Sequence, residues 1–129
     1  MIYEINKKAL KEQIENRVVN ILLIMGMSPN LNGYNYLKEG IKSAVTDPQN
    51  MSNLSKLLYP KIANKYNTTT SRVERGIRHA LENAYNKGRI FRLNSEFNLA
   101  IFEKYEKPTN AEFMAIVADK IALEVGMYR

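Results

Sequence analysis

The amino-acid sequence predicts an all-α fold, and three observations support this prediction. Apolar residues recur at helical steps of three and four in several separate stretches. Glycine, asparagine and proline stand between these stretches, where helices begin or end. The chain has 129 residues and no internal repeats, a length that suits one domain with a substantial core. We expect residues 1–13 to be a polar lead-in or the remnant of a linker, and residues 14–129 to be a single helical domain.

The first two predicted helices lie in the N-terminal part of the chain. One covers Ile14 to Met25 and is stopped by Gly26 and Pro29. The next begins near Asn32 and ends at Asp47-Pro48, because a residue before proline avoids the helical region. Their inward faces are expected to carry Ile14, Val18, Ile21, Leu22 and Met25, and then Tyr34, Leu37, Ile41 and Val45.

Two further helices, near residues 58–66 and 70–87, form a helix-turn-helix pattern. Asn67 falls between them, and asparagine tolerates the left-handed conformation that a tight turn requires. Ala63 is small enough for the second helix to cross the first closely. Gly76 either lowers the helix propensity by up to about 1 kcal/mol or permits the close approach of a neighbouring helix. The apolar stripe of the second helix comprises Val73, Ile77, Ala80, Leu81 and Ala84.

The opposite side of this second helix carries charged and polar side chains. A row at steps of three and four faces solvent or a ligand, and it contains Arg72, Arg75, His79, Glu82 and Asn86. Residues 61–92 hold eight Lys or Arg against two Glu, which equals the net charge of +6 of the whole chain. Such a localised basic patch attracts polyanions. A merely solvated basic surface is the alternative for the outlying Lys87, Arg89 and Arg92.

The C-terminal third contains one ambiguous segment and one well-defined helix. After a helix stop at Lys87-Gly88, parts of residues 89–106 alternate like a strand, so a β-hairpin wing competes with a short helix capped near Asn94-Ser95; we favour the helix. Thr109-x-x-Glu112 is a capping-box signature. The apolar stripe that follows, from Phe113 to Val125, is expected to close the core or to pair with a second copy of the protein.

The composition argues against several classes of function. Cysteine is absent, which excludes disulfides and thiolate metal sites and suits the reducing cytoplasm, where we expect the protein to reside. The longest apolar run, residues 18–27, is too short to span a bilayer, and the residues before it do not make a signal peptide. One histidine, with no Gly-rich phosphate loop, paired-carboxylate or metal-ligand motif, argues against an enzyme and against a cofactor.

Several blocks of the sequence together resemble one known family. They are Tyr34-x-Tyr-Leu-Lys-Glu, Leu58-Tyr-Pro-Lys-Ile-Ala, Asn67-Thr-Thr, Ser71-Arg-Val-Glu-Arg-Gly-Ile-Arg-His-Ala and Lys107-Pro-Thr-Asn-Ala-Glu-Phe-Met-Ala-Ile-Val-Ala-Asp-Lys120. Over roughly residues 14–123 they are similar to the C-terminal DNA-binding domain of the stage 0 sporulation response regulator of endospore-forming bacteria. The resemblance implies a bundle of about six helices, the fourth of which enters the DNA major groove. It also implies a regulator of transcription that binds short promoter boxes, often as tandem copies.

The resemblance also implies individual DNA contacts. It assigns base reading to Arg72, Glu74 and Arg75, and phosphate contact to Lys65, Ser71, Arg78, His79 and Lys107. Chemistry is consistent with these roles, because an arginine can bond guanine O6 and N7 together and a glutamate can accept from a cytosine amino group. The hydroxyls of Thr69 and Thr70 join the phosphate set, since they stand at a helix start with free backbone amides.

Two of these residues have simpler alternative roles. Glu74 follows Ser71 by three residues and precedes Arg78 by four, so a capping box or a surface ion pair is the alternative to base reading. His79 is the only histidine and has no second soft ligand nearby, so it is expected to be a phosphate or surface neighbour rather than a metal ligand.

The expected partner is double-stranded promoter DNA, with RNA polymerase and a second copy, as a homodimer or as tandem copies, as further candidates. The parent proteins carry a receiver domain with a phosphorylated aspartate, and no stretch of that length is present, so we expect an excised effector domain or a stand-alone relative. The alternative function is a helical interaction module that binds RNA polymerase or a second subunit through its last helix, with non-specific affinity for nucleic acid.

Overall fold

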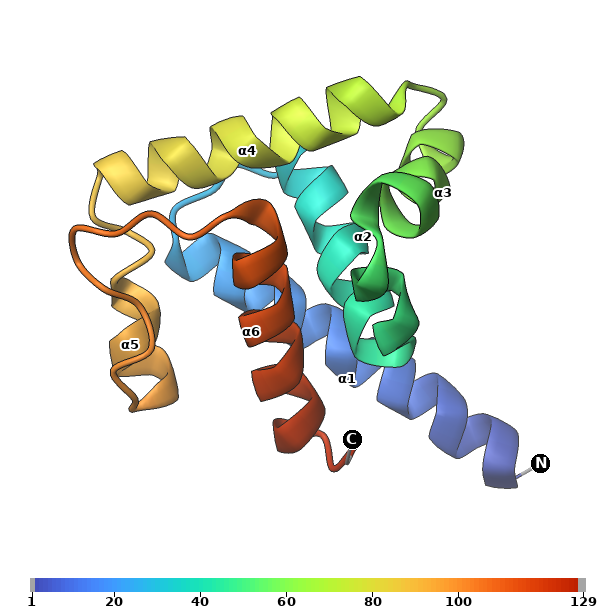
Figure 1. Cartoon of the computed structure of the whole chain (residues 1–129). Helices are drawn as coiled ribbons and strands as arrows, with labels where there is room; N and C mark the ends of the chain where they lie inside the picture. The colour runs from blue at the N-terminus through green and yellow to red at the C-terminus, as the bar shows by residue number, and fades with distance from the viewer. Residues whose placement is uncertain (1, 128–129) are drawn as a thin grey trace.

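The structure, a computed structural model that describes residues 2–127, contains six α-helices (Figure 1). They are α1 (Ile2–Ile24), α2 (Asn32–Thr46), α3 (Tyr59–Lys65), α4 (Thr70–Asn86), α5 (Arg92–Phe97) and α6 (Asn110–Glu124). A 3-10 segment, η1 (Pro48–Ser52), and a π-helical segment, η2 (Leu54–Leu58), lead from α2 into α3. No strand occurs within residues 2–127, and the prediction of an all-α fold is confirmed.

Helix α2 is the element around which the others pack. It contacts α1, α3, α4 and α6, and Figure 1 shows it beneath the long helix α4 and between α3 and α6. Leu37, Ile41 and Ala44 of α2 are completely buried. All the inward-facing residues predicted for the two N-terminal helices are buried in the same core. No helix in the described part of the chain is long and apolar enough to cross a membrane.

Helix ends follow the signals in the sequence. Helix α1 stops just before Gly26, which has a φ of +72°, and α4 stops just before Gly88, with a φ of +71°. At the start of α6 the predicted capping box is complete, because the Thr109 side chain accepts from Glu112 N and the Glu112 side chain accepts from Thr109 N, both at 3.1 Å. The local rules therefore place these boundaries correctly.

The predicted start of the first helix at Ile14 is wrong, whereas the assignment of residues 1–13 to a lead-in or linker remnant stays a prediction. Helix α1 begins at Ile2 and runs without interruption into the core. The segment from Lys7 to Gln13 is rich in lysine, glutamine, glutamate, alanine and leucine, which favour helix without giving an apolar stripe. Only Leu10 of this segment is partly buried against the core. A search for apolar periodicity therefore does not find the first turns of this helix.

Residues 89–106 form a short helix followed by an irregular segment rather than a hairpin. Helix α5 covers only six residues and ends at Asn98, which has a φ of +54°. The Asn94 amide holds the returning chain, since its Nδ2 donates to Phe102 O at 2.8 Å and its Oδ1 accepts from Ile101 N and Phe102 N at 3.0 and 2.8 Å. The preference for a helix over a hairpin wing is confirmed, although most of the segment is not helical. The predicted cap near Asn94-Ser95 is wrong, because α5 begins at Arg92 and both residues lie inside it.

Two glycines allow α2 and α4 to cross closely. A Cβ atom added at Gly33 would lie 2.5 Å from the backbone oxygen of Gly76. A Cβ atom added at Gly76 would lie 2.9 Å from Cδ2 of the Tyr36 ring. Of the two interpretations of Gly76, close approach is therefore the one that the structure supports. This crossing fixes α4 against the central helix.

Gly33→Ala is expected to lower the free energy of unfolding by about 1–3 kcal/mol, because the new methyl group collides with backbone that cannot rotate away. Urea denaturation with a constant m-value measures this loss. Gly40→Ala in the same helix is the matched control, since its methyl group would meet the flexible end of Met114, with Sδ at 2.8 Å. Equal effects of the two substitutions would contradict the importance of the crossing.

Candidate nucleic-acid interface

The turn between α3 and α4 is built from local bonds. Asn67 adopts a φ of +50°, as predicted for the turn, and Thr68 N donates to Ala63 O at 2.9 Å. The Thr69 hydroxyl accepts from Arg72 N at 3.2 Å and caps the start of α4. A helix-turn-helix geometry is therefore present. Because Thr69 is the cap, the alternative of a capping box between Ser71 and Glu74 is wrong.

Helix α4 is fixed on one side and open on the other. Val73, Ile77 and Leu81 are buried in the core, as predicted. Arg72, Arg75 and His79 lie on the opposite side and are exposed, and we call this side the outer face of α4. In Figure 1, α4 runs along one edge of the molecule and the other helices lie on one side of it. A long convex surface is thus available to a ligand.

The two arginines of the outer face are not engaged in ion pairs. Neither Arg72 nor Arg75 has a carboxylate partner among residues 6–127, whose side chains the structure describes. Arg75 Nε donates to Ser71 O at 3.4 Å, which directs this side chain toward the start of the helix. Exposed guanidinium groups without an internal anion retain their donors for an external acceptor.

Glu74 and Arg78 form an ion pair on the flank of α4. Arg78 Nη1 donates to both carboxylate oxygens of Glu74, at 2.8 and 3.1 Å. Both residues line a groove with Tyr59 and Asn110, at the start of α6. Asn110 Nδ2 donates to Tyr59 Oη and to Glu74 O, both at 3.2 Å. The surface ion pair named above as an alternative for Glu74 is therefore present.

Two predicted phosphate-contacting lysines are paired with carboxylates from other elements. Lys65 Nζ, at the end of α3, lies 2.8 Å from Oε1 of Glu39 in α2. Lys107 Nζ, in the segment before α6, lies 2.9 Å from Oε1 of Glu82 in α4. The hydrogen bond from Lys107 lowers the pKa of the Glu82 carboxyl below its ordinary value. These pairs join the edges of the outer face to the rest of the fold.

A comparison with protein families identifies the class of domain that carries this geometry. Residues 18–121 match the sequence model of the family described as "Sporulation initiation factor Spo0A C terminal". The chain belongs to this family. The Spo0A C-terminal family consists of DNA-binding domains of transcription factors and is not enzymatic. The chain is thus a DNA-binding domain of the sporulation-regulator type, as the resemblance implied.

The residues predicted to contact DNA, from the resemblance or from their place at a helix start, lie on α4 or on the elements next to it. The N-terminal end of α4 presents the exposed hydroxyls of Thr69, Thr70 and Ser71. His79 is exposed farther along α4, and Arg78 is half-buried on the flank. Lys107, in the segment before α6, reaches Glu82 of α4, whereas Lys65, at the end of the neighbouring helix α3, reaches Glu39 of α2. Their contacts with DNA stay predictions.

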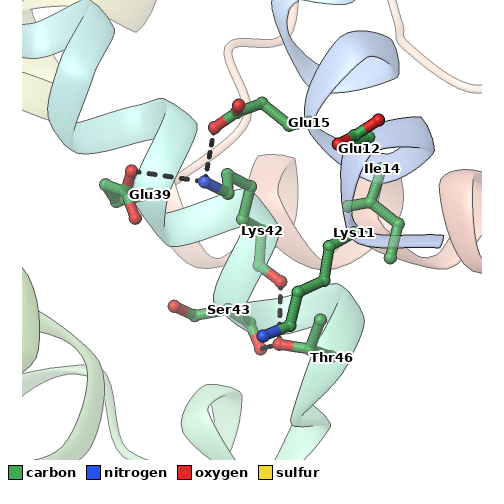
Figure 2. A pocket seen from close by; sticks show the side chains of 8 residues that line it. All are labelled: Lys11, Glu12, Ile14, Glu15, Glu39, Lys42, Ser43 and Thr46. Atoms are coloured by element: carbon green, nitrogen blue, oxygen red, sulfur yellow. Dashed lines mark hydrogen bonds and ion pairs between the residues drawn. The ribbon is translucent and has the colours of Figure 1, made fainter. Parts of the chain in front are cut away.

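A charged cluster between α1, α2 and α3 was not predicted from the sequence. Figure 2 shows Lys42 between two carboxylates, with Glu15 Oε1 at 2.6 Å and Glu39 Oε1 at 3.6 Å. Glu39 in turn binds Lys65, so four alternating charges lead from α1 to the helix-turn-helix. No local signal in the sequence identifies these partners, because Glu15 and Lys42 are separated by 27 positions.

The outlying arginines serve the fold rather than an open basic surface. Arg89 Nη1 donates to Gly26 O at 3.3 Å, and Arg92 Nη1 donates to Ile24 O at 3.2 Å. Ile24 is the last residue of α1 and Gly26 follows it by two positions, and free acceptors and the helix dipole at such a helix end favour cations. These two arginines therefore bind the chain itself and are not merely solvated.

Glu15→Gln is expected to reduce the loss of stability in acid. The hydrogen bond and charge of Lys42 lower the Glu15 pKa below its ordinary value of 4.5. Because folding lowers the pKa of Glu15, the ion pair stabilises the folded protein at pH values above 4.5. This stabilisation is lost as the pH falls through the pKa that Glu15 has in the folded state. Urea midpoints at neutral pH and at about pH 3 measure this difference.

Glu12→Gln is the matched control for this measurement, because Glu12 lies in the same helix and is exposed. The wild type and Glu12→Gln should lose more stability on acidification than Glu15→Gln does. Identical acid-induced losses in all three proteins would show that the Glu15–Lys42 pair contributes nothing.

Proposed function

We propose that α4 is a recognition helix that lies in the major groove of double-stranded promoter DNA and reads its sequence. The observation that carries this proposal is the unpaired state of Arg72 and Arg75 on the outer face of α4, directly opposite the buried Val73 and Ile77. An α-helix fits the major groove, and its first turns normally contact base edges in helix-turn-helix proteins. Both arginines lie in those first turns.

Base reading follows from the chemistry of the guanidinium group. Arg72 and Arg75 each present a planar set of donors that matches O6 and N7 of guanine. A good bidentate contact discriminates against a wrong base by roughly 1–3 kcal/mol. No carboxylate in the part of the chain whose side chains are described competes for either arginine. The Nη donors of Arg75 therefore stay available to a guanine even though its Nε bonds Ser71 O.

Glu74 joins this set through its link to Arg78. The pair is half-exposed, and an exposed ion pair contributes at most about 1 kcal/mol. When Arg78 turns to a DNA phosphate, the Glu74 carboxylate loses its partner and becomes available to accept from the amino group of cytosine. In this proposal the phosphate contact of Arg78 and the base contact of Glu74 form together.

The remaining predicted residues position the helix on the DNA backbone. Thr69, Thr70 and Ser71 offer hydroxyls at the start of α4, where unpaired amides and the helix dipole favour a phosphate. Lys65, His79 and Lys107 border the same helix. Contacts of this kind fix register and orientation, and they carry no sequence information by themselves.

An interaction module that uses the last helix is the weaker alternative. Phe113, Val117 and Ile121 of α6 are completely buried within the chain, so this stripe is occupied by the fold. RNA polymerase and a second copy of the domain, as a dimer or as tandem copies on DNA, stay candidate partners of other surfaces. If the domain acted only through such partners, Arg72→Ala with Arg75→Ala would leave its binding intact.

Arg75→Ala is expected to relax discrimination at one base pair by roughly 1–3 kcal/mol. Binding-site selection from random duplexes first gives the preferred sequence, and a mobility shift then compares this duplex with a scrambled one. Lys87→Ala is the matched control, since it removes one positive charge at the far end of α4 and should retain the discrimination. Equal affinity of the wild type for both duplexes would defeat the proposed function.

A further inference from the structure

The cations around the outer face of α4 fall into two groups. Arg72 and Arg75 have no carboxylate partner among the side chains of residues 6–127. Lys65 and Lys107 are each held by a carboxylate that comes from a different element, Glu39 of α2 and Glu82 of α4. The free cations are the proposed base readers, and the held cations are proposed phosphate contacts.

We propose that Glu39 and Glu82 are specificity-determining residues, whose ion pairs with Lys65 and Lys107 stay closed on non-operator DNA and open when the domain docks on its operator. This inference rests on the proposed function of α4. It adds a selection step at the phosphate contacts, which otherwise bind every duplex alike.

The physical basis is an exchange of counter-ions. A lysine that contacts DNA exchanges its carboxylate partner for a phosphate. This exchange is favourable only when the phosphate is in direct contact with the lysine, because salt screens exposed charges over roughly 8–10 Å. In loose, non-specific binding the phosphates have no fixed position relative to α4. Docking by Arg72 and Arg75 fixes that position, and the two lysines then exchange partners.

The structure of the pair with Glu39 suits such an exchange. The Glu39 side chain is only 14% exposed, whereas that of Lys65 is 54% exposed, so the carboxylate is fixed and the lysine can move. Lys42 Nζ lies 3.6 Å from the same carboxylate, and Figure 2 shows it between Glu39 and Glu15. When Lys65 leaves, Lys42 remains as the counter-ion, and Glu39 is not left as an isolated charge.

The ion pair between Lys107 and Glu82 affects the attraction of the edge of α4 for DNA. Glu82 and Lys107 are similarly exposed, at 40% and 36%, and Glu82 belongs to the row that includes Arg75 and His79. While the pair is closed, the Glu82 carboxylate neutralises the charge of Lys107, so Lys107 adds no net positive charge at this edge. A closed pair therefore limits the attraction of this edge for arbitrary DNA.

The test measures the salt dependence of binding to the selected duplex and to a scrambled duplex of the same length. Glu39→Gln and Glu82→Gln should each steepen the slope of log affinity against log salt by about one unit on scrambled DNA. Affinity for scrambled DNA should rise by up to about tenfold at ~0.1 M salt. The slope on the selected duplex should stay the same, because both lysines already contact phosphate there, so the specificity ratio falls.

Glu96→Gln is the matched control, because it also removes one negative charge from an ion pair. Its partner Arg17 lies in α1 and retains Glu124, with Nε to Oε2 at 2.7 Å. This variant should not change either slope. Adding Lys107→Met to Glu82→Gln should return the slope on scrambled DNA to the wild-type value. Thermal unfolding of each variant verifies that the fold is retained.

Two results would overturn the inference while leaving the proposed function intact. In the first, the wild type prefers the selected duplex, but neither Glu39→Gln nor Glu82→Gln changes the salt dependence of binding to scrambled DNA. The other is an equal steepening by Glu96→Gln, which would indicate a general effect of net charge. A wild type without any preference would defeat the proposed function, and the inference with it.

Discussion

The close crossing of α2 and α4 at Gly33 and Gly76 is the constraint on which the rest of the structure depends. It brings the buried stripe of α4 onto the central helix, where Val73, Ile77 and Leu81 are fully packed. Once that side is fixed, the period of the helix decides which residues point outward. Packing on the far side of the helix therefore decides that Arg72 and Arg75 point outward, and the bond from Arg75 to Ser71 O adds a local constraint.

The cations around α4 differ in how they are paired with carboxylates of the chain. Arg72 and Arg75 are unpaired within the described chain, Arg78 is paired within α4, and Lys65 and Lys107 are paired across elements. The excess of positive charge in residues 61–92 does not translate directly into free cations, because Arg89 and Arg92 also bind the end of α1. Net charge alone would thus overestimate the affinity of this surface for arbitrary DNA.

Much of the fold could be predicted from the sequence because it depends on local rules. Apolar periodicity predicted the buried faces of α1, α2 and α4. The turn was predicted from Asn67 alone, and the capping box from the pair Thr109 and Glu112. The first turns of α1 were missed because polar helix formers leave no apolar stripe. The site residues came from the family resemblance. Their partners Glu39, Glu82 and Asn110 depend on tertiary contacts, which local spacing does not encode.

The central claim is that α4 occupies the major groove and that its arginines approach guanine N7. Methylation interference tests this most directly, because dimethyl sulfate places a methyl group on N7 of guanine in the major groove. In the preferred duplex, the account predicts that methylation of individual guanines blocks binding of the wild type. In Arg75→Ala, the interference at one guanine should disappear while the others persist. Binding that tolerates methylation at every guanine N7 of a guanine-containing preferred duplex would contradict the account.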